Sequence, residues 1–217
     1  MKKIKTPILR WPGGCFVSSY HWENGVGPNR KPMFDKAWRV EDPNSFGTDE
    51  YIKLCRKIGC EPYICTNAGT GTPEEMSNWA EYCNLDNEGY YSKMRIANGY
   101  EKPHDVKFWS IGNENYGWWE IGAKSAEEWG RLVESAKMLK HVDPTIQLSA
   151  AALADVDWNM NLLKHCGQFL DWISLHEYWD MVPQVNELAN YEQCMAYTDR
   201  VDHAVAEVRG LLTALRL

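Results

Sequence analysis

Five short apolar segments, separated by stretches with helical signals, constrain the fold of this chain most strongly. They cover residues 8–11, 61–66, 106–111, 146–151 and 170–175. Strand signals that alternate with helix signals are typical of parallel sheets, because the connection between two parallel strands has to cross over the sheet, usually as a helix. The length of 217 residues suits one domain with a substantial core. The sequence therefore predicts an α/β fold with about five parallel strands and crossover helices.

Two helices between these strands have clear boundaries. The first is expected from about Thr48 to Gly59, with acidic residues in its first turn. The second begins at Pro73, where Thr72 is a suitable N-cap and Glu75 would complete a capping box. These signals fix the direction of the chain after the first and second strands.

Later helices are predicted from the same kinds of signal. Ser125 and Glu128 form another capping box, which begins a helix that ends at Asp143. From about Tyr191 the apolar residues keep helical spacing to the C-terminus. The two remaining long connections, residues 18–46 and 84–104, are expected to be irregular.

Unusual residues follow four of the five strands. They lie in the sequences RWPGGC, TNAGTG, GNEN and LHEYW. Ligand sites in parallel α/β proteins are built at the carboxyl ends of the strands. Four coincident placements therefore predict a site at this edge of the sheet.

Glu114 is the main candidate for chemistry. It follows the strand in the stretch FWSIGNENYGWWE, and Trp109, Trp118 and Trp119 are close to it in sequence. Partial desolvation by these rings would raise the pKa of the carboxyl, which suits a general acid. Asn113 is positioned to hydrogen-bond a sugar hydroxyl. The alternative is that Glu114 only caps the following turn.

His176 and Tyr178 alternate after the last strand, so their side chains should share the face that points into the site. Glu177, between them, should point the other way. Arg10 and Cys15 flank the turn WPGG, where the glycines allow a ligand to approach closely. A structural histidine and a small buried cysteine are the alternatives for His176 and Cys15.

Composition excludes several functions. A net charge of −7 argues against a nucleic-acid partner, and no stretch has the roughly 20 apolar residues of a membrane span. No paired ligand motif predicts a metal or other cofactor, and most of the seven cysteines should be buried, reduced thiols. No secretion signal is evident, so a cytoplasmic protein is expected. The 11 Trp and 11 Tyr suit sugar recognition, although most of these rings are expected to be part of the core.

Four motifs together resemble one enzyme family in their order and spacing. They are LRWPGGCFVSSYHWENGVGP, EPYICTNAGTGTPEE, VKFWSIGNEN and DWISLHEYW, and they extend from about Ile8 to Trp179. The chain is similar to the α-L-arabinofuranosidases of glycoside hydrolase family 51. The resemblance implies a (β/α)8 TIM barrel and a retaining mechanism with two glutamates. It also implies release of terminal arabinofuranosyl groups from hemicellulosic, arabinose-containing oligosaccharides.

The resemblance assigns a role to each matched residue. Glu114 corresponds to the acid/base of the family. The residues that would bind the sugar are Asn113, His176, Tyr178, Arg10, Cys15 and the aromatic Trp38. Cys15 departs from the asparagine of many relatives, which puts its contact in doubt. The pair Trp118-Trp119 also differs, so the leaving-group side would accept a different linkage.

Part of the family's pattern has no match in the sequence. Residues 1–217 match barrel strands two to six, and no predicted strand after Trp179 ends in the carboxylate that would be the nucleophile. Glu177 is the only other acid expected near a motif. We therefore expect a single incomplete barrel domain, inactive or nearly so alone, that self-associates through its open sheet edges. The alternatives are an endo-β-1,4-glucanase or xylanase and a non-catalytic sugar-binding remnant.

Overall fold

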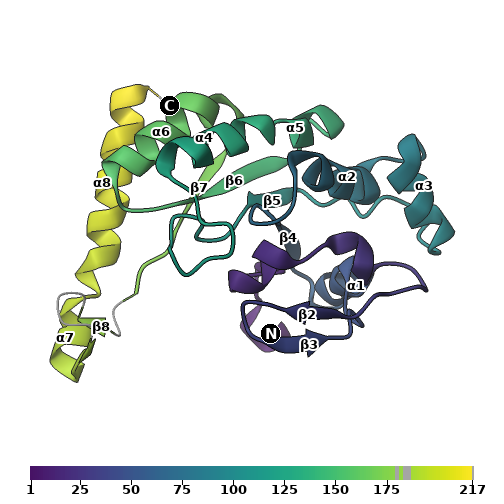
Figure 1. Ribbon diagram of the computed structural model, residues 1–217, viewed down its shortest axis with the longest axis horizontal. Helices are drawn as coiled ribbons and strands as arrows, with labels where there is room; N and C mark the ends of the chain where they lie inside the picture. The colour runs from purple at the N-terminus through teal and green to yellow at the C-terminus, as the bar shows by residue number, and fades with distance from the viewer. Residues whose placement is uncertain (179–180, 183–186, 217) are drawn as a thin grey trace.

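Five parallel strands form one curled, open sheet, a partial (β/α)8 barrel (Figure 1). The computed structural model describes residues 1–178, 181–182 and 187–216. The strands follow one another in space in chain order, and each pairs in parallel with the next. They are β1 Ile8–Trp11, β4 Glu61–Thr66, β5 Phe108–Ile111, β6 Gln147–Ala152 and β7 Trp172–Leu175. All five predicted strands are thus confirmed, with ends that differ by at most two residues.

Helices connect these strands and cover one side of the sheet. Figure 1 shows α4, α5 and α6 along β6 and β7, with α8 beside α6 at the far end. The helices are α1 Thr48–Ile58, α2 Pro73–Asn84, α3 Gly89–Ala97, α4 Ala126–Ser135, α5 Met138–Val142, α6 Val156–Cys166, α7 Tyr191–Ala196 and α8 Asp199–Leu215. Short 3-10 segments are Lys2–Ile4, Gly14–Ser19, Trp22–Gly25 and Gly167–Phe169. No helix in the described parts of the chain is both long and apolar enough to cross a membrane.

Several predicted elements differ from the structure. Residues 84–104 contain helix α3, and residues 18–46 contain a hairpin of β2 Met33–Asp35 and β3 Val40–Asp42. Each of the last two predicted helices is broken into a pair, α4 with α5 and α7 with α8. A further two-stranded ladder joins β8 Met181–Val182 to β9 Glu187–Leu188, whereas no strand was expected there. Helix α6 is not predicted from the sequence.

The capping predictions are confirmed with one exception. Glu128 accepts from the backbone of Ser125 at 2.9 Å, and the Ser125 hydroxyl accepts from the backbone of Glu128 at 3.3 Å. Thr72 caps α2 by accepting from the backbone of Glu75. The Glu75 carboxylate, however, lies 3.0 Å from His21 Nδ1. A tertiary partner thus replaces the second half of this capping box.

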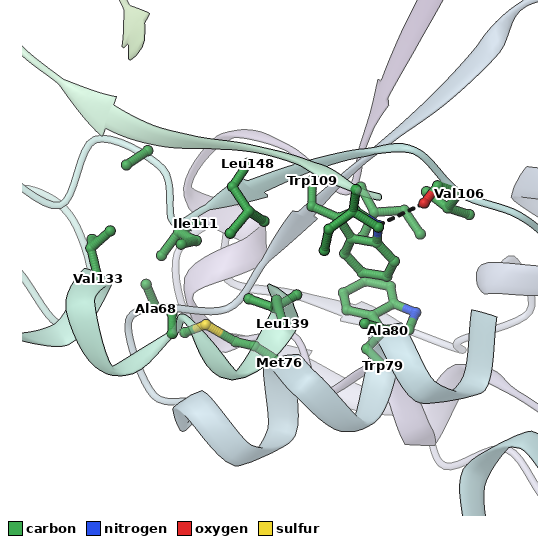
Figure 2. Close-up of a cluster of buried hydrophobic side chains, with 14 of the residues drawn as sticks. Ala68, Met76, Trp79, Ala80, Val106, Trp109, Ile111, Val133, Leu139 and Leu148 are labelled. Atoms are coloured by element: carbon green, nitrogen blue, oxygen red, sulfur yellow. Dashed lines mark hydrogen bonds between the residues drawn. The ribbon is translucent and has the colours of Figure 1, made fainter. Parts of the chain in front are cut away.

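The face of the sheet that packs on the helices forms the core (Figure 2). Ile64, Trp109 and Leu148 are paired across neighbouring strands, so they share this face, and all three are buried. Figure 2 shows Trp109 reaching toward Trp79 of α2, with its indole N–H bonded to the Val106 carbonyl at 2.9 Å. Core packing on this face therefore holds the strands in place, and the residues of the site follow the carboxyl ends of the same strands.

The opposite face of the sheet is open near the amino ends of the strands. A hollow of about 440 Å³ is lined by side chains that include Ile8, Phe108 and Trp172, and Trp172 is 57% exposed. Toward the carboxyl ends of the strands, the residues on the same face become polar. Arg10 and Tyr63 are register partners there, and the Tyr63 hydroxyl lies 2.5 Å from Ser149 Oγ. The polar end is the carboxyl end of the strands.

Candidate active site

A strained turn after β5 presents Glu114 at the carboxyl edge of the sheet. Gly112 has φ of +69°, and a Cβ atom there would lie 2.1 Å from Asn115 Oδ1, so only glycine fits. Asn115 Oδ1 accepts the backbone N–H of Asn113 at 3.1 Å. Glu114 follows with φ of +45°, a left-handed conformation that is unusual for a non-glycine residue. The turn thus aims the Glu114 side chain at the neighbouring loops.

Three donors surround the Glu114 carboxylate, which is in a residue only 6% exposed. His176 Nδ1 lies 2.6 Å from Oε1, and the Tyr178 hydroxyl donates to the same oxygen at 3.0 Å. Trp119 Nε1 donates to Oε2 at 3.3 Å. The expectation that His176 and Tyr178 share a face is confirmed. The carboxylate therefore joins the ends of two strands and does more than cap its own turn.

The prediction that the pKa of Glu114 is raised is wrong. Its pKa is lowered from the ordinary 4.5, first because His176 hydrogen-bonds the ionised carboxylate, while burial acts in the opposite direction. Tyr178 and Trp119 lower the pKa further. Glu114 is therefore ionised in the free protein at neutral pH, in the form that accepts protons.

The three tryptophans near Glu114 in sequence separate in space. Trp109 is fully buried on the helix-facing side of β5, and Trp118 is 88% exposed. Only Trp119 bonds to the carboxylate, and its ring packs edge-on against Trp118 with centroids 6.0 Å apart. The expected desolvation by all three rings thus reduces to contact with one of them.

Arg10 and Asn113 form a second group beside Glu114. Arg10 Nη2 donates to Asn113 Oδ1 at 2.8 Å and to the Cys65 sulfur at 3.3 Å. Cys15 is half-buried in the loop after β1, and its thiol pKa is raised to about 12, chiefly by burial and then by a hydrogen bond to Glu120. The seven cysteines are all free, and four of them are buried.

Glu120 is a site residue that the sequence interpretation missed. It is 4% exposed; the Ser18 hydroxyl donates to its Oε1, and Asn113 Nδ2 donates to its Oε2 at 3.4 Å. The expectation that Glu177 is the only other acid near the motifs is therefore wrong. The available signal was the position of Glu120 in the same aromatic loop as Glu114.

Trp38 lies apart from these contacts in the turn between β2 and β3. Its side chain is 65% exposed, and its backbone N–H donates to Asp35 at 3.3 Å. Contact of Trp38 with a sugar stays a prediction. Of the motif LHEYW, the final Trp179 lies outside the described residues.

In the described part of the chain, no group of three or more His, Cys, Asp or Glu side chains is placed to hold a metal ion. The arrangement around Glu114 is instead one carboxylate with hydrogen-bond donors from a histidine, a tyrosine and a tryptophan. Such a carboxylate can accept and return a proton when an acidic or basic group is bound beside it.

Comparison with known proteins gives concordant results. Residues 1–196 match the model of the "Alpha-L-arabinofuranosidase 1 domain". The intracellular exo-α-(1→5)-L-arabinofuranosidase 1 of Bacillus subtilis is 39% identical, over 96% of this chain and 42% of that protein. The corresponding enzyme of Halalkalibacterium halodurans is 40% identical, over 88% of this chain and 40% of that protein.

Solved structures agree with the sequence matches. An arabinose complex of the α-L-arabinofuranosidase from Thermotoga maritima superposes with a TM-score of 0.91 at 43% identity, covering 98% of this chain and 43% of that one. The family 51 enzyme from Thermotoga petrophila gives 0.85 at 42% identity, covering 99% and 45%. The chain thus spans less than half the length of the relatives that it matches.

Proposed function

The chain belongs to the α-L-arabinofuranosidases of glycoside hydrolase family 51, and we propose that it supplies the acid/base half of a retaining site for terminal arabinofuranosyl groups. The observation that carries this proposal is the Glu114 carboxylate at the end of β5, bonded by His176 and Tyr178 from beyond β7. Residues 1–217 would then be one part of a (β/α)8 catalytic domain.

Glu114 acts on the oxygen of the glycosidic bond in this proposal. A retaining glycosidase needs one carboxyl that protonates the leaving group and later takes a proton from water. The lowered pKa suits the second step, because an ionised Glu114 can deprotonate water. For the first step Glu114 has to carry a proton. A bound leaving group that displaces the donors from Glu114 would raise its pKa and favour that protonation.

The nucleophile of this route is a separate carboxyl, about 5–5.5 Å from the acid/base. The short strands β8 and β9 form a two-stranded ladder that is separate from the parallel sheet. We therefore propose that residues 1–217 alone turn over glycosides slowly or not at all, and that Glu114 works with a carboxyl from another segment or chain.

Sugar binding is assigned to the polar group beside Glu114. Asn113, Arg10 and Cys15 line the same carboxyl edge, and they offer an amide, a guanidinium and a thiol to sugar hydroxyls. Tyr178, 65% exposed, adds an aromatic ring and its hydroxyl. Trp38 would complete the aromatic wall if the β2–β3 hairpin contacts the ligand.

The substrate and setting follow from the relatives. The Thermotoga maritima structure is an arabinose complex, and the Bacillus subtilis enzyme is named an intracellular exo-acting arabinofuranosidase. These names support an arabinose-containing oligosaccharide as the ligand, a role in arabinan degradation and a cytoplasmic location.

A binding experiment tests the proposal on the chain itself. Ligand-observed NMR with millimolar L-arabinose and arabino-oligosaccharides should show binding that is stronger than that of xylo- or cello-oligosaccharides. Loss of arabinose binding in Asn113→Ala, with an unchanged melting temperature, would support the assigned site. Preference for xylo- or cello-oligosaccharides would favour an endo-acting enzyme, and no binding of any of these sugars would refute a sugar site in this chain.

A further inference from the structure

Glu120 links the loops that follow two different strands. It lies six positions after Glu114, in the loop after β5, while its partner Ser18 lies in the loop after β1, 102 residues away in sequence. The Ser18 hydroxyl donates to Oε1, and Asn113 Nδ2 donates to Oε2 at 3.4 Å. This contact ties the two loops that carry Cys15 and Asn113, two of the candidate sugar-binding residues.

The burial of Glu120 costs free energy, which suggests that its carboxylate has a function. The residue is 4% exposed, and within the described ranges 1–178, 181–182 and 187–216 no basic side chain forms an ion pair with it. Burying a carboxylate without a cation costs free energy, which hydrogen bonds only partly offset. An apolar side chain would serve packing alone better at this position.

The amide of Asn113 has a single favourable orientation because of Glu120. Its oxygen accepts from Arg10 at 2.8 Å, and its nitrogen donates to Glu120 at 3.4 Å. A flipped amide would set its N–H groups against the guanidinium and its oxygen against the carboxylate, so both contacts would be repulsive. In the observed orientation one N–H of Asn113, a residue that is 2% exposed, is not used by Arg10 or Glu120.

The thiol of Cys15 also responds to the carboxylate of Glu120. Burial, followed by the hydrogen bond to Glu120, raises the thiol pKa to about 12, so the sulfur keeps its proton at neutral pH. Glu120 therefore contacts Asn113 and raises the thiol pKa of Cys15, two of the residues that the proposed function assigns to the sugar, without itself being exposed.

We propose that Glu120 is a positioning residue, which orients the Asn113 amide and the Cys15 thiol toward the hydroxyls of the bound sugar. The link to sugar binding rests on the proposed function, whereas the orientation of Asn113 does not. Glu120 would thus set which hydroxyl positions of the ligand meet a donor and which meet an acceptor.

The test compares two substitutions by NMR on the whole chain. Glu120→Gln keeps the shape and one acceptor oxygen, whereas Glu120→Met removes both acceptors. The side-chain amide resonances of Asn113, assigned by their loss in Asn113→Ser, are followed without ligand, and the Kd for L-arabinose is measured by titration. Glu101→Gln, at an exposed position, is the matched control.

Glu120→Met should shift the Asn113 amide resonances, speed the exchange of their protons with water and weaken L-arabinose binding by about tenfold, the equivalent of one hydrogen bond. Glu120→Gln should change the Asn113 resonances and the arabinose affinity less than Glu120→Met does, because it keeps one acceptor oxygen. A purely structural role would not produce this graded pattern. The Glu101→Gln control should leave both unchanged.

Unchanged Asn113 resonances in both Glu120 variants would overturn the inference, whether or not the sugar binds. Shifted resonances with unchanged arabinose affinity would also overturn it, because the orientation would not matter for the ligand. If the unmodified chain binds no arabinose while the resonances shift, the orientation by Glu120 holds and the proposed function fails.

Discussion

Replacement of His176 by phenylalanine should raise the pKa of Glu114. The change removes the 2.6 Å contact to Oε1, the largest cause of the lowered pKa. A hydrogen bond to a charged group contributes about 1.5–3 kcal/mol, so its complete loss would raise the pKa clearly. Because Tyr178 and Trp119 remain and His176 is 24% exposed, so that water replaces part of the contact, we expect an effect at the lower end of this range.

The measurement is a carboxyl ¹³C NMR titration, with the Glu114 signal assigned by its loss in Glu114→Gln. His203→Phe, on the exposed side of α8, is the control. The lowered pKa of Glu114 stabilises the fold above about pH 4.5, and this stabilisation is lost as pH falls through the folded-state pKa. His176→Phe should therefore also reduce the acid dependence of unfolding. An equal or lower Glu114 pKa in His176→Phe would refute the assignment of His176 as the main cause.

Three further outcomes are expected. The purified chain should hydrolyse p-nitrophenyl α-L-arabinofuranoside near the background rate, because a second carboxyl is needed; robust turnover that Glu114→Gln abolishes would show that such a carboxyl is present. The open edges of β1 and β7 and the apolar hollow between them should cause self-association, which light scattering detects, and a clean monomer at tens of micromolar would contradict it. With a thiol pKa of about 12, Cys15 should react with iodoacetamide at pH 8 far more slowly than in the unfolded chain, as mass spectrometry of the labelled peptide would show; equal rates would contradict the raised pKa, whose first cause is burial.

The strands were predictable because their signals are local. Each is a short apolar run bounded by proline, glycine or polar residues, and the parallel order follows from the helices between them. Helix α3 was not predictable in this way, because its stability comes from elsewhere. Arg95, fully buried, donates to the backbone carbonyls of Tyr82, Leu85, Asp86, Tyr100 and Glu101. Hydrogen bonds from a buried guanidinium to carbonyls of other segments produce no periodic pattern in the sequence.

The site shows the same division between local and distant causes. The position of Glu114 at a strand end, and the shared face of His176 and Tyr178, follow from alternation along single strands. The sign of the pKa shift does not, because the donors come from residues 62 and 64 positions away. Glu120 was missed for a related reason: it stands in the aromatic loop with Glu114, but its partner Ser18 is 102 positions away in sequence.

The left-handed backbone at Glu114 has a consequence for selection. A side chain in this conformation costs roughly 1–2 kcal/mol, which glycine would avoid. In a population of variants screened for folding at acid pH, where the stabilisation by the ionised Glu114 is lost, this position would therefore drift from glutamate toward glycine or asparagine. A screen that requires activity, with the second carboxyl supplied, would hold the glutamate in place. Position 114 is thus a point where the two screens should diverge, and deep sequencing after each would reveal it.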